Sequence, residues 1–341
     1  MTIRPFIAVG ENIHCTRVYK VGGKFCCEQP GGGYGIPFDA PSGGGREVLR
    51  VPDAFLERAD WQAGKVKHCQ VAIWQGTQGD DDGRRAGVAY LQQLARSQAQ
   101  CGARYLDLNV DEYSTDTAER VRLMQWLVGV VQAATPVPVS IDSSNLEILA
   151  AGLQAADPAR GRPMVNSVSL ERADAVEVAA RHRAVVIASA AGETGLPATQ
   201  DERLANVERL MGKLRAAGFD EGAIHVDPLV FPISTDSVNG ARFLESVSAI
   251  RAAYGPAIHI VAGLSNVSFG MPNRKLINQV FAWLAVEAGA DGGIVDPEQI
   301  NGEILAGLDT QSTGFKLARA LLTGEDEYGM EYIAAAREGT I

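Results

Sequence analysis

Apolar, β-branched runs recur along the chain, and six of them end in a short polar cluster. The clusters are LDLNVD (106–111), SIDSSN (140–145), VNSVS (165–169), HVDPL (225–229), GLSNVS (263–268) and IVDP (294–297). In a barrel of parallel strands, the sides of the strands are buried and their carboxyl ends form the ligand-binding face. Polar residues repeated at strand ends therefore predict a ligand site at the rim of a parallel barrel.

The spacing of these runs predicts eight strands that alternate with eight helices. We expect strands near 5–10, 103–108, 136–142, 163–167, 184–190, 223–227, 257–263 and 291–296. We expect helices near 83–101, 115–134, 145–155, 171–182, 200–217, 239–254, 273–289 and 303–322. Ser114 or Thr115, Asn145 and Asn239 are the expected caps of three of these helices. This alternation predicts the α/β class and a (β/α)8 TIM barrel.

The connection after the first predicted strand is much longer than the others. We read the chain as one barrel domain over 1–341, with a Gly/Pro-rich insertion at 15–80 and a C-terminal tail at 323–341 that holds a short helix at 326–337. A loop that leaves the carboxyl end of a barrel strand is expected over the barrel mouth. The insertion therefore predicts a lid or a partner-docking loop, with a passive insertion as the alternative. Its QPGGGYG segment lacks the GK[ST] ending of a phosphate loop.

Composition narrows the class of protein. The chain has 341 residues, of which 46% are hydrophobic, so it can bury one large core. Its net charge is −10 and it has no Lys/Arg-rich run, which argues against a nucleic-acid partner. The five cysteines are scattered without a CxxC pair, which predicts reduced thiols and a cytoplasmic location. We expect no membrane association, because no signal-peptide pattern and no apolar stretch of about 18 residues is present.

The rim clusters contain carboxylates that share strand faces with other polar residues. Residues two apart lie on the same face of a strand, which pairs Asp107 with Asn109, Ser140 with Asp142, and His225 with Asp227. Burying an unpaired carboxylate costs several kcal/mol, so converging acids need a cationic, hydrogen-bond-donating or metal partner.

Two kinds of ligand could satisfy these carboxylates. A divalent metal could use His14, His225 and Asp227, as in a metal-dependent barrel hydrolase or lyase. However, the chain has no HxH pair, and Asn and Ser are weak metal ligands. An amide-rich heterocycle is the other candidate, because Asp accepts hydrogen bonds from an NH/NH2 edge while Asn both donates and accepts. A pterin has such an edge, and the mixture of Asp with Asn favours it.

Six motifs resemble those of the pterin-binding barrel methyltransferases. They are GEN (10–12), DLNV (107–110), DSSN (142–145), NS (166–167), DPL (227–229) and GLSNVSFGMPNRKLIN (263–278). The resemblance is to enzymes that exchange a methyl group between methyltetrahydrofolate and the cobalt of a corrinoid protein, and to the folate domain of cobalamin-dependent methionine synthase. It covers nearly all of the barrel in order and leaves residues 15–80 unmatched.

The resemblance implies a pterin site and a set of roles. It implies that Asp142, Asn166 and Asp227 hydrogen-bond the pterin ring and that Asn266 lies near the reactive ring nitrogen, with Asn266, Asp142 and Asp227 as the catalytic residues. The remaining pocket residues that it implies are Glu11, Asn12, Asp107, Asn109 and Arg274. It further implies tetrahydrofolate or methyltetrahydrofolate as substrate, cobalamin carried by a partner corrinoid protein, no metal of the chain's own, and a homodimer. The direction of methyl transfer stays open.

Some features depart from the resemblance or leave alternatives open. His14 is not a general feature of the family, and it is either a site residue or a loop histidine. His225 is expected to support Asp227. Phe269 matches the methionine-synthase branch, whereas some members linked to corrinoid/iron–sulfur proteins carry a polar residue there. Dihydropteroate synthase is an alternative, but DLNVDEYSTD and IVDPEQIN replace its Gly/Ser/Arg-rich second loop and its late basic motif. A non-catalytic pterin-binding subunit is another alternative.

Overall fold

Eight strands form a closed barrel in the computed structural model, which describes residues 5–40 and 44–341. The strands are β1 (Ile7–His14), β7 (Ala103–Asn109), β8 (Val139–Asp142), β9 (Met164–Val168), β10 (Val185–Ser189), β11 (Ile224–Asp227), β12 (His259–Gly263) and β13 (Gly292–Val295). Their order around the barrel is β1, β13, β12, β11, β10, β9, β8, β7, and the registered pairs run parallel. The predicted (β/α)8 TIM barrel is confirmed, and every predicted barrel strand overlaps an observed one.

Helices separate the barrel strands, as the periodicity predicts. Seven of the predicted helices are observed as α4 (Asp81–Gln100), α5 (Thr117–Gln132), α6 (Leu146–Ala155), α7 (Asp174–Arg181), α8 (Gln200–Ala216), α9 (Asn239–Tyr254) and α10 (Arg274–Ala288). The helix predicted over 303–322 is instead two helices, α11 (Gly302–Ala306) and α12 (Thr313–Thr323). The break arises because Gly307 ends the first and Ser312 caps the second by accepting the Phe315 N–H. In the tail, α13 spans Met330–Glu338.

The helix caps agree with the sequence at one position and differ at two. Asn145 caps α6 as predicted, and its Oδ1 accepts the Glu147 and Ile148 N–H groups at 2.8 and 3.3 Å. Neither Ser114 nor Thr115 caps α5, because Asp116 does so by accepting the Ala118 N–H. Asn239 is the first residue of α9, and its side chain donates to Pro232 O at 2.9 Å. The prediction was wrong at these positions because several polar residues adjoin each helix start.

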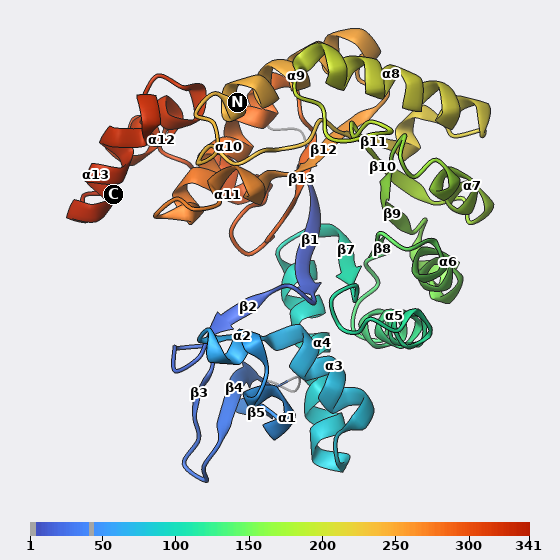
Figure 1. The fold of residues 1–341 in the computed structure, drawn as a ribbon, viewed down its shortest axis with the longest axis vertical. Helices are drawn as coiled ribbons and strands as arrows, with labels where there is room; N and C mark the ends of the chain where they lie inside the picture. The colour runs from blue at the N-terminus through green and yellow to red at the C-terminus, as the bar shows by residue number, and fades with distance from the viewer. Residues whose placement is uncertain (1–4, 41–43) are drawn as a thin grey trace. The chain divides into compact units, whose positions relative to one another are not determined.

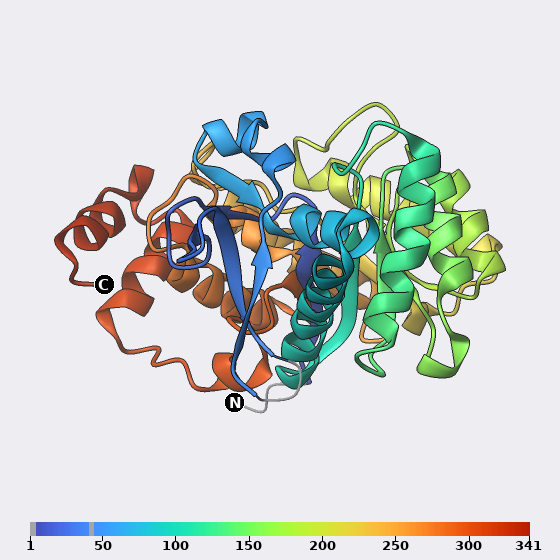
Figure 2. The same cartoon turned by 90° about the horizontal axis from the view of Figure 1, so that it is seen from below.

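Residues 15–80 contain regular elements where the sequence predicts a long loop. Strands β2 (Val18–Lys20) and β6 (Lys65–Lys67) pair antiparallel, and β3 (Cys27–Glu28), β4 (Tyr34–Asp39) and β5 (Arg46–Arg50) form a second antiparallel sheet. Three helices complete the segment, namely α1 (Asp53–Leu56), α2 (Ala59–Gln62) and α3 (His68–Gln78). Helices α3 and α4 pack against each other and against β5 (Figure 2). Residues 41–43 of the Gly/Pro-rich stretch lie outside the described residues.

The chain divides into two compact units. One contains the described residues up to Gly10, Cys101–Arg104 and Met164–Ile341, and the other contains Glu11–Gln100 and Tyr105–Pro163. In the first unit, α9 packs against both α8 and α10 (Figure 1). The ring centroids of Phe243 and Phe281 are 5.1 Å apart. We call this the β9–β13 unit and the other the β7–β8 unit.

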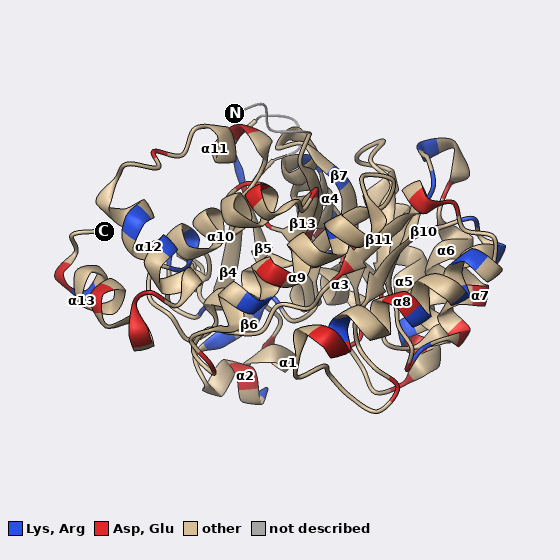
Figure 3. Ribbon diagram, turned by 90° about the horizontal axis from the view of Figure 1, so that it is seen from above, with Lys and Arg blue, Asp and Glu red and all other residues tan. Residues whose placement is uncertain are grey.

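The structure also shows how charged residues are distributed on the helices and whether any helix could cross a membrane. Helices α8 and α13 each carry basic and acidic residues together (Figure 3). In the described part of the chain, none of the helices combines the length and apolar character that crossing a bilayer would need.

Candidate functional site

In the β7–β8 unit, polar residues meet at the carboxyl ends of two neighbouring strands. Asn109 lies opposite Asp142 in the strand register, and Asp107 lies opposite Ser140. The Asn109 Nδ2 donates to Asp142 Oδ2 at 3.1 Å and to the Asp142 carbonyl at 3.2 Å. Asp107 and Asn109 are 1% and 6% exposed, so this is a built polar cluster inside the barrel strands. Asn109 and Asp142 are therefore joined by hydrogen bonds across adjacent strands, while the approach of Asp107, Asp142 and Asp227 to one cavity stays a prediction.

His14 lies at the end of β1 and contacts Asp142. Its Nε2 is 3.1 Å from Asp142 Oδ2. Its Nδ1 accepts the Thr16 N–H at 3.1 Å and lies 2.7 Å from the Thr16 hydroxyl oxygen. Of the two readings that the sequence left open, the structure thus gives His14 a contact with a predicted site residue.

Asp111 holds the turn next to Asp142 and was not singled out by the sequence reasoning. Its carboxylate accepts hydrogen bonds from the Ser143 hydroxyl, the Ser144 N–H and the Ser144 hydroxyl, at 2.5, 2.9 and 3.1 Å. The Asp111 N–H in turn donates to Asn109 Oδ1 at 3.0 Å. Asp111 therefore fixes the DSSN turn that carries Asp142. The clue was in the sequence, since Asp111 closes the LDLNVD cluster two residues after Asn109.

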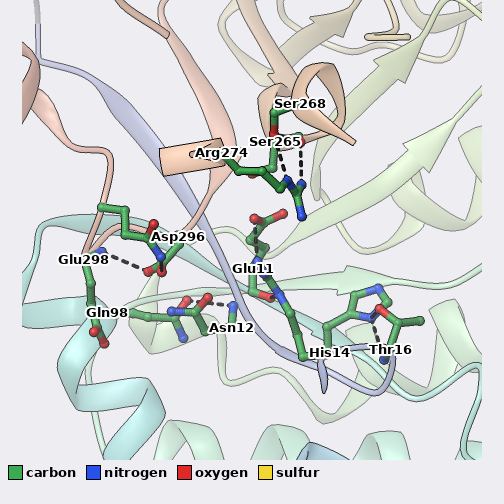
Figure 4. Close-up of polar contacts among 12 residues, drawn as sticks. Glu11, Asn12, His14, Thr16, Gln98, Ser265, Ser268, Arg274, Asp296 and Glu298 are labelled. Atoms are coloured by element: carbon green, nitrogen blue, oxygen red, sulfur yellow. Dashed lines mark hydrogen bonds and ion pairs between the residues drawn. The ribbon is translucent and has the colours of Figure 1, made fainter. Parts of the chain in front are cut away.

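Glu11 and Asn12 precede His14 on β1, as the GEN motif predicts. Glu11 forms an ion pair with Arg17, whose Nε also donates to the Glu11 carbonyl at 3.2 Å. The Asn12 N–H donates to the Gln98 side-chain carbonyl at 3.1 Å (Figure 4). Gln98 is fully buried, so it fixes the β1 backbone at Asn12 from helix α4.

In the β9–β13 unit, Asp227 ends β11. Its Oδ1 accepts the Leu229 N–H at 2.8 Å, and Leu229 has a left-handed φ of 70° that closes this turn. Burial raises the pKa of the Asp227 carboxyl to about 6, although hydrogen bonds from Leu229 and Gly263 and the charge of Arg203 act in the opposite direction. A carboxyl that titrates near neutral pH at a strand end is typical of a functional site.

Arg203 supports the Asp227 turn and was not predicted from the sequence. It lies on α8, is 1% exposed, and its Nε donates to the Pro228 carbonyl at 3.0 Å. Its guanidinium also lies over the Phe231 ring at 5.1 Å. A buried cation next to an acidic turn lowers the free energy of the ionised carboxylate. Arg203 therefore acts on Asp227 from the adjacent helix.

Asn166 lies within β9, opposite Ile187 of β10. The register between these strands shifts directly after this pair, so that Val168 pairs with Ala188. The Ser167 hydroxyl accepts a hydrogen bond from the Arg172 guanidinium at 2.7 Å. The NS motif therefore lies at an irregular part of the sheet that a basic side chain helps to fix.

Asn266 lies on a one-turn helix, η3 (Leu264–Ser268), that directly follows β12. Its side chain is exposed, and its Nδ2 lies so near Gly263 that a Cβ there would be only 3.1 Å away. The Arg274 Nε donates to the Ser268 hydroxyl at 2.9 Å, and another guanidinium nitrogen donates to the Ser265 carbonyl at 3.0 Å (Figure 4). The same guanidinium lies over the Phe269 ring at 4.6 Å. Arg274 thus holds the turn that presents Asn266.

His225 packs against a second histidine. Its ring centroid is 4.7 Å from that of His259, and burial lowers its pKa to about 3. The imidazole therefore stays neutral at physiological pH. Support of Asp227 by His225 stays a prediction. In the described ranges, no three His, Cys, Asp or Glu side chains are grouped so that they could hold a metal ion.

The two units present similar polar chemistry at their strand ends. In the β7–β8 unit the Asp142 carboxylate accepts from the Asn109 amide, and in the β9–β13 unit Asp227 ends β11 and accepts the Leu229 N–H, while Asn266 follows β12. Such groups accept from N–H donors and offer both donor and acceptor to a heterocycle edge.

Comparison with known proteins agrees with this chemistry. Residues 80–296 match the family described as pterin binding enzyme. The chain is 31% identical over 262 residues to the methylcorrinoid:tetrahydrofolate methyltransferase of Eubacterium limosum, a match that covers 74% of this chain and 89% of that protein. It is 33% identical over 221 residues to methionine synthase of Mycobacterium leprae (strain TN), covering 61% of this chain and 18% of that protein.

The fold also has a solved counterpart. Dihydropteroate synthase from Xanthomonas albilineans, in complex with 7,8-dihydropteroate, superposes with a TM-score of 0.52 at 19% identity, over 71% of this chain and 88% of that one. This likeness shows a shared barrel. Family membership rests on the matches in sequence, which span most of the barrel, and by these the chain belongs to the pterin-binding methyltransferase family.

Proposed function

We propose that this enzyme moves a methyl group between N5 of tetrahydrofolate and the cobalt of a corrinoid protein. The observation that carries the proposal is the exposed Asn266 amide, presented by a turn that Arg274 fixes within the GLSNVSFGMPNRKLIN motif. The Eubacterium limosum relative, named methylcorrinoid:tetrahydrofolate methyltransferase, supports the same reading.

The pterin is proposed to bind through the carboxylates and amides of the strand ends. Asp142 and Asp227 accept hydrogen bonds from the N–H and NH2 groups of the ring, and Asn166 supplies a donor and an acceptor. The other proposed pterin-site residues of the β7–β8 unit are Asp107, Asn109, Glu11 and Asn12. The raised pKa of Asp227 supports a binding role, because a carboxyl held in a buried position gains from hydrogen bonds donated by a ligand.

Asn266 is proposed to act on the reactive ring nitrogen. A tertiary amine is a poor leaving group, so N5 must take up a proton from water as its bond to the methyl group breaks. The electron pair of the broken C–N bond then stays on a neutral amine, and the reverse transfer releases the proton. A side-chain amide carbonyl can stabilise that protonated nitrogen, and a positioned group of this kind contributes typically about 10²- to 10⁴-fold to a rate. The cobalt of the partner takes up or supplies the methyl group, so the chain needs no nucleophile of its own.

The finer assignments are part of the same proposal. The corrinoid partner, the homodimer and the absence of a metal cofactor follow from the family resemblance. A cytoplasmic location is supported by the five cysteines, which are all free thiols. Both directions of methyl transfer are compatible with one site.

Methyl transfer from methylcobalamin to tetrahydrofolate tests the proposal. We expect demethylation of the corrinoid and formation of methyltetrahydrofolate, and we expect Asn266→Ala to lower kcat by about 10²-fold while folate affinity changes little. Asp142→Asn and Asp227→Asn should instead weaken folate binding. Arg209→Met, which removes an exposed guanidinium on α8, is the control and should behave as wild type.

Other outcomes would point to the alternatives. Unchanged turnover in Asn266→Ala would remove its proposed role. Folate binding without any methyl transfer, even from a methylated corrinoid protein, would indicate a binding subunit. Condensation of a pterin with an aminobenzoate would indicate a dihydropteroate synthase, and activity lost on chelation of a stoichiometric metal would indicate a hydrolase or lyase.

A further inference from the structure

His14 and Asp142 are 128 residues apart in sequence, yet their side chains are joined. The His14 Nε2 lies 3.1 Å from Asp142 Oδ2, and the Asn109 Nδ2 donates to the same oxygen, also at 3.1 Å. One carboxylate oxygen therefore has two partners, which come from two different neighbouring strands, β1 and β7.

The hydrogen bonds of Thr16 determine which nitrogen of His14 carries the hydrogen. The Thr16 backbone N–H donates to Nδ1 at 3.1 Å (Figure 4). A ring nitrogen that accepts from an N–H has no hydrogen of its own, so Nε2 carries the hydrogen in the neutral ring. The Thr16 hydroxyl, 2.7 Å from Nδ1, then also donates to it. His14 therefore donates to Asp142 through its Nε2–H.

This arrangement leaves the second oxygen of Asp142 available. Within residues 5–40 and 44–341, Asp142 Oδ1 accepts no hydrogen bond, and the side chain is 24% exposed. A carboxylate offers about four lone-pair positions, and the two donors occupy those of Oδ2. Held at Oδ2 in this way, the carboxylate keeps Oδ1 available for a hydrogen bond from a ligand.

The His14–Asp142 contact is too exposed to contribute much to the free energy of unfolding. The side chains of His14 and Asp142 are 22% and 24% exposed, so water competes for their hydrogen bonds. Contacts between partly exposed polar groups contribute little to the free energy of unfolding. The chain of contacts from Thr16 through His14 to Asp142 instead fixes the orientation of one carboxylate.

We propose that His14 is a positioning residue that orients Asp142 for the N–H edge of the pterin, with its tautomer set by Thr16. The inference rests on the proposed function, because it assumes that Asp142 contacts the folate substrate. His14 acts through Asp142 and not on the reacting atoms, so its loss weakens folate binding more than it slows the chemical step.

A double-mutant cycle on the full chain tests the proposal. We expect His14→Ala to weaken tetrahydrofolate binding, measured by calorimetry, by about tenfold, the effect of one hydrogen bond to a charged group. His14→Gln keeps a side-chain N–H near the position of Nε2 and should recover most of that affinity. In an Asp142→Asn background, His14→Ala should change affinity by less than about threefold. His182→Ala, which removes a histidine at the end of α7, is the matched control.

The outcomes distinguish a failure of the proposed methyltransferase function from a failure of the proposed role of His14. If wild type binds no tetrahydrofolate, the proposed function fails and the role of His14 fails with it. If wild type binds but the effects of His14→Ala and Asp142→Asn simply add, or His14→Gln is as weak as His14→Ala, only the role of His14 is overturned. Should His14→Ala not fold, ¹⁵N NMR of the wild-type ring and Thr16→Val replace it. A hydrogen on Nδ1, or unchanged folate affinity in Thr16→Val, would overturn the proposal.

Discussion

Asp227 provides the most direct pH test at the scale of single residues. Its pKa is raised from 3.8 to about 6, chiefly by burial. Below pH 6 the carboxyl becomes protonated and loses acceptor capacity, so we expect folate affinity to fall as the pH drops from about 7 to 5. Asp227→Asn should bind more weakly at pH 7 and should lose this part of the pH dependence. Titrations of both proteins over that range separate the Asp227 contribution from protonation of the ligand.

The Asp227 carboxyl affects the stability of the fold with the opposite pH dependence. Because the folded protein binds this proton more tightly than the unfolded chain does, Asp227 contributes stability below pH 3.8 that is lost as the pH rises through 6. The free energy of unfolding of wild type, relative to Asp227→Asn, should therefore decrease between pH 4 and pH 6. A difference that stays constant over this range would contradict the raised pKa.

Contacts between polar side chains could be predicted where they followed from the positions of the residues at strand ends. Asn109 and Asp142 close their strands in the polar clusters, and their contact follows from the register of two adjacent parallel strands. The supports of the two carboxylates were not predictable. Arg203 reaches the Asp227 turn from a helix, and His14 reaches Asp142 across 128 residues, so neither pairing has a local sequence signal.

At the scale of elements, the main discrepancy lies in residues 15–80. Strand β4 contains Pro37 and Gly35, residues that sequence reading assigns to turns, and β3 is only two residues long. Helix α3 is buried over most of its length, so it lacks the alternation of polar and apolar faces that identifies a surface helix. Of the elements of this segment, α3, β4 and β5 pack against α4, and the others pack within the segment.

The α3/α4 crossing gives a prediction at this scale. A Cβ added to Gly87 would lie 2.5 Å from both the Ala72 carbonyl oxygen and the Gly76 nitrogen, which are backbone atoms of α3. We therefore expect Gly87→Ala to lower the free energy of unfolding by about 2 kcal/mol through overpacking. Gly129, on α5, has no atom within 4 Å of the corresponding position. Gly129→Ala should raise stability by up to about 1 kcal/mol through helix propensity.

Urea unfolding followed by circular dichroism measures both changes, with the slope of the transition as a check on the unfolded state. If Gly87→Ala were as stable as Gly129→Ala, the close approach of α3 and α4 would be wrong. The comparison is a matched one, because both variants add a single methyl group inside a helix.

At the scale of the whole molecule, the alternation of strands and helices was enough to predict the barrel. Parallel strands require long crossover connections, and the helical segments between the polar clusters have the required length. The division into two compact units could not be predicted, since one boundary falls within β1, between Gly10 and Glu11. Within the second unit, α3, β4 and β5 of residues 15–80 pack against α4, and these contacts have no local sequence signal.

Whether residues 15–80 help to bind the corrinoid partner remains a proposal that can be tested. The turn between β3 and β4 is exposed, and a side chain at Gly31 would meet no atom within 4 Å. We therefore expect Gly31→Trp to leave the fold unchanged and to leave kcat/KM for free methylcobalamin at the wild-type value. If the turn contacts the partner, kcat/KM for a methylated corrinoid protein should fall about tenfold, because a bulky group in an interface displaces the docked surface. Gly212→Trp, at an equally open position on α8, is the control for an added exposed tryptophan.

Two outcomes would contradict this prediction. Equal kcat/KM values for the two variants with the protein-bound corrinoid would exclude the turn from the docking surface. A lower kcat/KM for Gly31→Trp with free methylcobalamin as well would indicate that the turn acts in the pterin site itself.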